Sequence, residues 1–152
     1  MLVRLADTSH GADYFRRWHR LVECSGSLWV HKASHHFDLL NWWIDSDPES
    51  VYALGSLDHY GKNGTFRAEN CRTCPHTSKC KFYYDITRNQ NYMDLYVANE
   101  KYDGYLRDGC VFKNDVNIFD KMAATIRYKN GVQVAYSLTT YSPYEGYRIA
   151  FN

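Results

Sequence analysis

The clearest pattern of apolar and polar positions predicts a helix over residues 33–44. Phe37, Leu40 and Ile44 recur at i, i+3 and i+7, which places them in one stripe along such a helix. We expect this stripe to be buried. The turn-forming residues 45–48 (DSDP) predict where the helix ends.

A second helical pattern covers residues 13–22. Its apolar positions recur at helical spacing and are Tyr14, Trp18, Leu21 and Val22. Its arginines fall on the opposite side and are Arg16, Arg17 and Arg20. Such a cationic side is most often a solvated face, although it could also bind a phosphate or a carboxylate.

Strand patterns dominate the later part of the chain. Residues 123–128 and 132–138 flank an Asn-Gly pair, which is a strong signal for a β-hairpin. Residues 50–59 alternate apolar side chains on both sides, which predicts a strand covered on both faces. The last residues, 149–152, look like a strand that the sequence leaves incomplete, so we expect a truncated piece of a longer protein.

Between these patterns lies a long irregular segment. Residues 60–81 are polar and cysteine-rich without sustained periodicity, and residues 92–102 predict a short helix. Helices come early and strands late, without the alternation of a parallel doubly wound sheet. The class is therefore predicted to be α+β.

Composition describes an ordinary globular protein of one domain over residues 1–152. The net charge of +1 gives no electrostatic case for a nucleic-acid partner, and no stretch has the length of a signal peptide core or of a membrane span. We expect a cytoplasmic protein, while export of a longer parent stays open. The aromatic fraction of 16% favours either a sugar-stacking pocket or a large buried interface.

Titratable side chains concentrate at the start of the 33–44 helix. His35 and Asp38 lie one turn apart, so a carboxylate could orient an imidazole that acts as a general base. The alternative is that these histidines only cap the helix and form hydrogen bonds. His31 and His35, at i and i+4, could instead be two metal ligands, but no third ligand is evident.

The cysteines form a second cluster. Cys71 and Cys74 make a C-x-x-C turn, Cys80 follows, and Cys110 comes from farther along the chain. Four thiolates could hold a structural zinc ion that stabilises the irregular segment. We expect Cys110 as the fourth ligand ahead of His76, which lies too close to Cys74 for the chain to turn back. Free thiols, or one incidental disulfide, are the alternative.

Several segments together resemble the second domain of the Gfo/Idh/MocA family of nicotinamide-dependent oxidoreductases. These segments are residues 31–43 (HKASHHFDLLNWW), 15–20 (FRRWHR), 25–26 (SG), 108–112 (DGCVF), the Asn-Gly hairpin and 142–148 (SPYEGYR). The resemblance touches most of the chain. It implies an open, mostly antiparallel sheet with helices packed on one face, as in glyceraldehyde-3-phosphate dehydrogenase.

The resemblance also implies that the cofactor and the substrate are bound mainly by different domains. The family binds NAD or NADP mainly through an N-terminal Rossmann domain with a glycine-rich turn and a catalytic lysine, and this sequence has no G-x-G-x-x-G. We expect the parent enzyme to oxidise a sugar or cyclic polyol, and the isolated chain to be inactive. A homo-oligomer formed through the open sheet face is also expected.

The family's site residues carry over onto the histidine-rich segment. His35 matches the histidine of the motif and is the expected catalytic acid/base, and Asp38 matches the acidic residue that follows. His31 stands where an aspartate is common, which could suit an acidic sugar or alter the chemistry. Lys32 and Trp18 are expected to bind substrate together with His31 and Asp38. The tyrosine-rich turn 141–148 either lines this pocket or is a packed surface turn.

Overall fold

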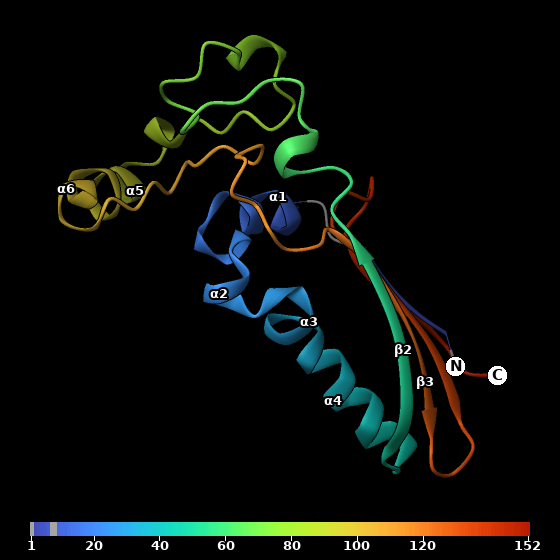
Figure 1. Ribbon diagram of the computed structural model, residues 1–152. Coiled ribbons are helices and arrows are strands. Elements are labelled where there is room, and N and C mark those ends of the chain that lie inside the picture. Colours follow the sequence, from blue (N-terminus) through green and yellow to red (C-terminus); the bar gives the residue numbers. More distant parts are fainter. Residues whose placement is uncertain (1, 7–8) are drawn as a thin grey trace.

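The computed structural model describes residues 2–6 and 9–152, with side chains from residue 11 onwards. One sheet is packed on one face by helices, and a long irregular excursion extends beyond it (Figure 1). The strands are β1 (Leu2–Ala6), β2 (Pro48–Ser56), β3 (Lys121–Tyr128), β4 (Gln133–Thr139) and β5 (Gly146–Ala150). The helices are α1 (Ser9–Arg16), α2 (Val22–Ser25), α3 (Ser27–His31), α4 (Ala33–Ile44), α5 (Gln90–Leu95) and α6 (Glu100–Asp103).

The sheet has the strand order β2-β3-β4-β1-β5. Strand β1 runs parallel to β4, and each of the other neighbouring pairs is antiparallel. The sheet is therefore open and mostly antiparallel. The expected α+β class is confirmed.

The predicted hairpin is formed by β3 and β4. Burial alternates strictly along β3, because successive side chains point to opposite faces of the sheet. At the turn, Gly131 has φ +86°, a conformation that residues with a Cβ rarely adopt, and its N–H donates to the Tyr128 carbonyl over 2.9 Å. The Asn-Gly signal thus marked the hairpin correctly.

Helix α4 has the predicted bounds and covers the inner face of the sheet. Leu40 is 1% exposed, and Phe37 and Ile44 are half-buried against the core. The ring of Phe37 lies 4.8 Å from that of Tyr136 on β4. The helix ends at Ile44, and the next residue, Asp45, caps it: its N–H donates to the Asn41 carbonyl and its left-handed backbone (φ 49°) turns the chain out of the helix.

Residues 13–22 do not form the single helix that their spacing predicts. Helix α1 ends at Arg16, Arg17 is extended, a 3₁₀ turn covers Trp18–Arg20, and α2 starts at Val22. The break buries Arg16 and His19, while Trp18 and Val22 are 40% and 45% exposed. Tertiary contacts of the two polar residues therefore override the apolar periodicity.

Strand β2 is not covered on both faces, contrary to the expectation. It lies at the edge of the sheet, and Val51, Tyr52 and Leu54 are all more than 60% exposed. The helices pack instead on β3 and β4, where Tyr128 donates to Asn41 over 2.7 Å. A strand beside the helix layer rather than beneath it keeps its apolar side chains at the surface.

The excursion between β2 and β3 is held by buried polar groups. Asp120 is fully buried, and its carboxylate accepts the backbone N–H groups of residues 58, 59 and 60 over 2.7–2.9 Å. Arg72 makes a bidentate pair with buried Asp108 at 2.9 and 3.0 Å and also pairs with Glu100. The predicted helix over 92–102 is split into α5 and α6, with a 3₁₀ turn between them. Hydrogen bonds and ion pairs of buried side chains therefore hold this excursion, which has little regular secondary structure.

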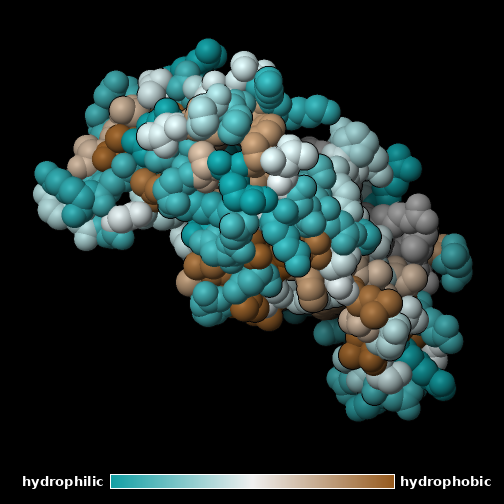
Figure 2. Space-filling model, turned by 45° about the horizontal axis from the view of Figure 1, so that its top comes forward, coloured by the Kyte–Doolittle hydropathy of each residue, from teal (hydrophilic) through white to brown (hydrophobic). Residues whose placement is uncertain are grey.

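The face of the molecule shown in Figure 2 is mostly hydrophilic, with separate apolar patches. One patch lies at the lower right of that view. Within the described ranges, no helix has both the length and the apolar character needed to cross a bilayer.

Candidate functional site

An aromatic and histidine cluster joins the 3₁₀ turn after α1 to the end of α3. The His19 ring stacks on Tyr14 at 4.6 Å and on His31 at 4.9 Å, and lies 3.8 Å from Trp18, all between ring centroids. The Trp18 ring is 40% exposed, so the cluster has one solvent-facing wall. We call these four residues the histidine–aromatic cluster.

His19 is the most perturbed group in this cluster. It is 7% exposed, and its Nδ1 atom has no hydrogen-bond partner among the described residues. Burial, followed by the positive charge of Arg17, lowers the pKa of His19 from 6.5 to about 4. His19 is therefore neutral at physiological pH, with an imidazole nitrogen left unused.

His31 and Tyr14 share a hydrogen bond. The His31 Nδ1 atom lies 3.0 Å from the Tyr14 hydroxyl. Burial lowers the pKa of His31, with further contributions from nearby Lys32 and His35, and burial raises the pKa of Tyr14. Both groups are neutral near pH 7, so the cluster is uncharged and suits a neutral polar ligand.

A tight turn places this cluster. Gly26 and Ser27 are both left-handed, with φ of +64° and +76°, and the conformation is costly for Ser27 because it has a Cβ. The Ser25 hydroxyl donates to the His19 carbonyl over 2.9 Å and accepts the Ser27 N–H over 3.0 Å. These bonds tie the His19 turn to the start of α3, which carries His31.

The predicted site residues lie on and beside this cluster, with one exception. His35 is exposed on the first turn of α4, and Lys32 is exposed at the junction of α3 and α4, close enough for both to influence the pKa of His31. Asp38 is also exposed, but within the described chain no hydrogen bond or ion pair joins it to His35. The adjacent His36 turns inward instead, with its Nδ1 atom 3.0 Å from the Tyr136 hydroxyl.

The spacing of His31 and His35 does not make a metal site in this structure. The Nδ1 atom of His31 is engaged by Tyr14. Among the residues described, no group of three or more histidine, cysteine, aspartate or glutamate side chains is arranged to hold a metal ion.

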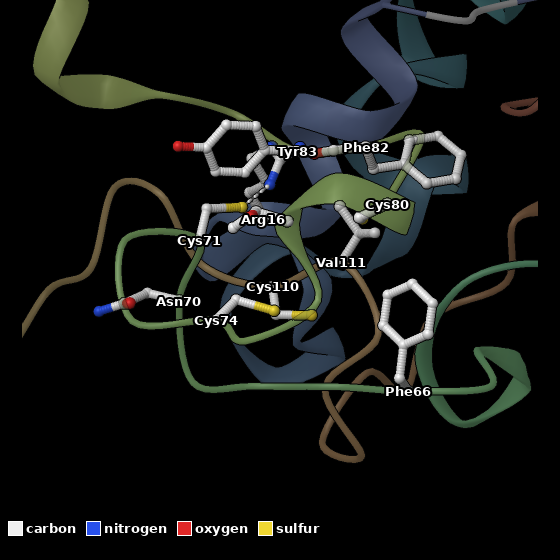
Figure 3. A pocket seen from close by; sticks show the side chains of 11 residues that line it. Arg16, Phe66, Asn70, Cys71, Cys74, Cys80, Phe82, Tyr83, Cys110 and Val111 are labelled. Carbon is white, nitrogen blue, oxygen red and sulfur yellow. Dashed lines mark hydrogen bonds between the residues drawn. The ribbon is translucent and has the colours of Figure 1, made fainter.

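The four predicted cysteine ligands come together around one pocket (Figure 3). Cys71 and Cys110 are buried, and Cys74 and Cys80 are half-buried. Arg16 lines the same pocket and is 6% exposed, so the expectation of a solvated arginine face is wrong at this position. Arg17 and Arg20 bond instead to Tyr105 and Asp115.

Part of the tyrosine-rich turn 141–148 packs against the fold, and the rest lies at the surface. Tyr141 stacks on His59 with ring centroids 4.7 Å apart, whereas Tyr144 and Tyr147 are 52% and 73% exposed. None of these contacts joins the turn to the histidine–aromatic cluster.

The fold agrees with comparisons to known proteins. The model of the "Oxidoreductase family, C-terminal alpha/beta domain" matches residues 2–152, and the chain belongs to this Gfo/Idh/MocA family. The chain is also similar to the Bacillus subtilis (strain 168) protein named "Putative oxidoreductase YteT", with 36% identity over 159 aligned residues. That alignment covers 96% of this chain and 37% of the relative, so the chain spans little more than a third of its length.

Sequence reasoning missed two members of the site, His19 and Tyr14. His19 lies within residues 15–20 (FRRWHR), which carry part of the resemblance but predict no functional role for this histidine. Its signal was an isolated histidine between arginines and beside a tryptophan. Only the break after α1 shows that this histidine is buried.

Proposed function

We propose that this chain is the substrate-binding domain of an NAD(P)-dependent oxidoreductase that acts on a sugar or cyclic polyol. The observation that supports it best is the exposed His35 next to a neutral, partly exposed histidine–aromatic cluster. Sugar rings bind on aromatic faces, and their hydroxyls need neutral donors and acceptors nearby. The cluster offers both beside His35, which is near enough to influence the pKa of His31.

In this proposal His35 handles the proton. Oxidation of a carbinol removes a hydride from carbon and a proton from oxygen, so a base must lie within hydrogen-bond reach of that oxygen. An imidazole nitrogen of His35 takes the proton, and solvent access at its exposed position lets the proton leave afterwards. In the reverse direction the same nitrogen returns the proton to the alkoxide oxygen.

Lys32 and His31 orient the hydroxyl groups. The exposed ammonium group of Lys32 can donate to a substrate oxygen, while the hydrogen bond to Tyr14 fixes the His31 ring. The exposed face of Trp18 supplies the stacking wall. Asp38 has a weaker case, because no hydrogen bond or ion pair joins it to His35 among the described residues.

The dinucleotide itself does not fit this chain alone. The sequence lacks the glycine-rich turn through which backbone N–H groups approach a pyrophosphate. The proposal therefore assigns NAD or NADP mainly to another domain of the parent protein. The chemistry that the cofactor supplies when bound is acceptance of the hydride.

The test uses the full-length protein that carries this domain, with NAD⁺ or NADP⁺ and a panel of aldoses and inositols. We expect H35N to lower kcat by about 100- to 10,000-fold with little change in KM, and to abolish the acid limb of the pH–rate profile. The matched control is H36Q, because His36 faces Tyr136 rather than the cluster. Equal activity of H35N and the unmodified enzyme would refute the assignment.

The alternative function is a non-catalytic, zinc-stapled module that binds a carbohydrate or a protein. It predicts saturable carbohydrate binding that H35N leaves unchanged, and no turnover with either nicotinamide cofactor. The same panel, measured by calorimetry, separates the two functions.

We also propose that the open sheet face pairs subunits. Tyr52 and Leu54 on this face are 68% and 61% exposed, and the small side chains of Ala123 and Ala135 lie exposed on the neighbouring strands. An exposed sheet face of this kind suits contact with the same face of a second copy. Light scattering should show an oligomer that L54E dissociates, and a monomer for both proteins would contradict this proposal.

A further inference from the structure

Three cysteines that are close in sequence, together with Cys110 from farther along the excursion, surround a cavity of about 10 Å³. This volume has room for about one water-sized sphere, so it suits a single ion rather than a substrate. We propose that Cys71, Cys74, Cys80 and Cys110 bind one zinc ion as four thiolates. The site is separate from the histidine–aromatic cluster and has a structural role.

Backbone donors already face two of the sulfur atoms. Cys74 Sγ accepts the His76 N–H over 3.4 Å and Cys110 Sγ accepts the Phe112 N–H over 3.4 Å, each from the residue two positions later. A third sulfur, that of Cys71, accepts from Arg16 Nη1 at 3.1 Å.

Arg16 places a positive charge beside the cysteines. Its guanidinium group is buried and donates to Cys71 Sγ, to the Gly109 carbonyl at 3.1 Å and to the Phe82 carbonyl. No carboxylate of the described residues forms an ion pair with it, although a buried cation is costly without an opposite charge. Zinc with four thiolates carries a net charge of −2, and Arg16 offsets part of that charge from inside the fold.

Cys110, rather than His76, is placed to be the fourth ligand. The ring of His76 stacks on Phe66 with centroids 4.7 Å apart, and His76 does not line the pocket. Cys110 does line it, and the segments that carry Cys71 and Cys110 are already joined by the Cys71 N–H to Asp108 carbonyl bond of 2.9 Å. The backbone therefore presents four cysteines without His76.

Binding requires the thiols to turn inward. Within the described chain the four side chains do not converge as a ready metal-binding group, so rotation about χ1 must accompany the loss of four protons. The reaction is Zn²⁺ + 4 RSH → [Zn(SR)₄]²⁻ + 4 H⁺, which involves no redox change. The ion would join residues 71–80 to the segment of Cys110, and the hydrogen bond from Arg16 to Cys71 connects this site to α1.

The test is metal analysis of the purified chain, followed by titration of the metal-free chain with Zn²⁺ and Co²⁺. We expect one zinc per chain, release of protons on binding, and a cobalt spectrum with the strong visible and charge-transfer bands of a tetrahedral thiolate site. C71S, C80S and C110S should each lose stoichiometric zinc. C24S is the matched control, because Cys24 is exposed and lies outside the pocket, and it should keep the metal.

Two results would overturn the proposal. One is a chain that contains no zinc, gives no thiolate spectrum with Co²⁺, and whose pocket thiols react with a thiol reagent as fast as Cys24. The other is iron with acid-labile sulfide in place of zinc. Because the cobalt spectrum is recorded on the unsubstituted chain, a serine variant that fails to fold does not obscure the outcome.

Discussion

Acid should destabilise this protein through His19, and the substitution H19F isolates the effect. The pKa of His19 is lowered to about 4 in the folded state, chiefly by burial, whereas the unfolded chain takes up this proton near 6.5. Between these two values the unfolded state binds more protons, so stability falls as the pH falls. From pH 7.5 to pH 5.0 the linkage relation gives a loss of about 2 kcal/mol from this one residue.

The assay is urea unfolding of both proteins, followed by tryptophan fluorescence, at pH 7.5 and pH 5.0. Phenylalanine keeps the stacking on Tyr14 and Trp18 but cannot titrate, so the variant should lose about 2 kcal/mol less than the unmodified chain over this range. Other titrating groups are common to both proteins and cancel in the difference. An equal loss in the two proteins would refute the reasoning, because it would mean that His19 takes up its proton as readily in the fold as in the unfolded chain.

Two further substitutions test buried side chains that stabilise the fold. D120A removes the fully buried carboxylate that accepts three backbone N–H groups, and we expect a loss of about 3–5 kcal/mol in urea unfolding; a loss below about 1 kcal/mol would contradict this role. L40A leaves a cavity under α4, at 1% exposure, and should cost about 2–5 kcal/mol while leaving the thiols around Cys71 as protected as before; a thermal melt with thiol titration checks both points.

The sequence determined the elements whose signals are local. The apolar stripe on residues 33–44 predicted α4 with its observed bounds, because Leu40 is buried and Phe37 and Ile44 pack half-buried against the core. The Asn-Gly pair located the β3–β4 hairpin, because Gly131 has the positive φ that the turn requires. The α+β class followed from such local signals, whereas the family followed from the resemblance of several segments, among them the one that carries His31, Lys32 and His35.

The tertiary structure decided the features that depend on distant partners. The helical spacing of residues 13–22 gave no sign that the chain breaks after Arg16, because the break depends on the burial of Arg16 beside Cys71 and of His19 beside His31. The exposure of β2 was equally hidden, since a strand's apolar pattern is the same beneath a helix layer and beside it.

The same division applies to the two candidate sites. Residue spacing placed His35 and Asp38 on one side of a helix, but only the fold showed that no hydrogen bond joins them in the described chain and that His19 completes the cluster. Residue spacing also grouped three cysteines, whereas the approach of Cys110 and the charge of Arg16 depend on the path of the whole excursion. Local periodicity determines which residues share an element, and long-range packing determines which of them become buried and what surrounds them.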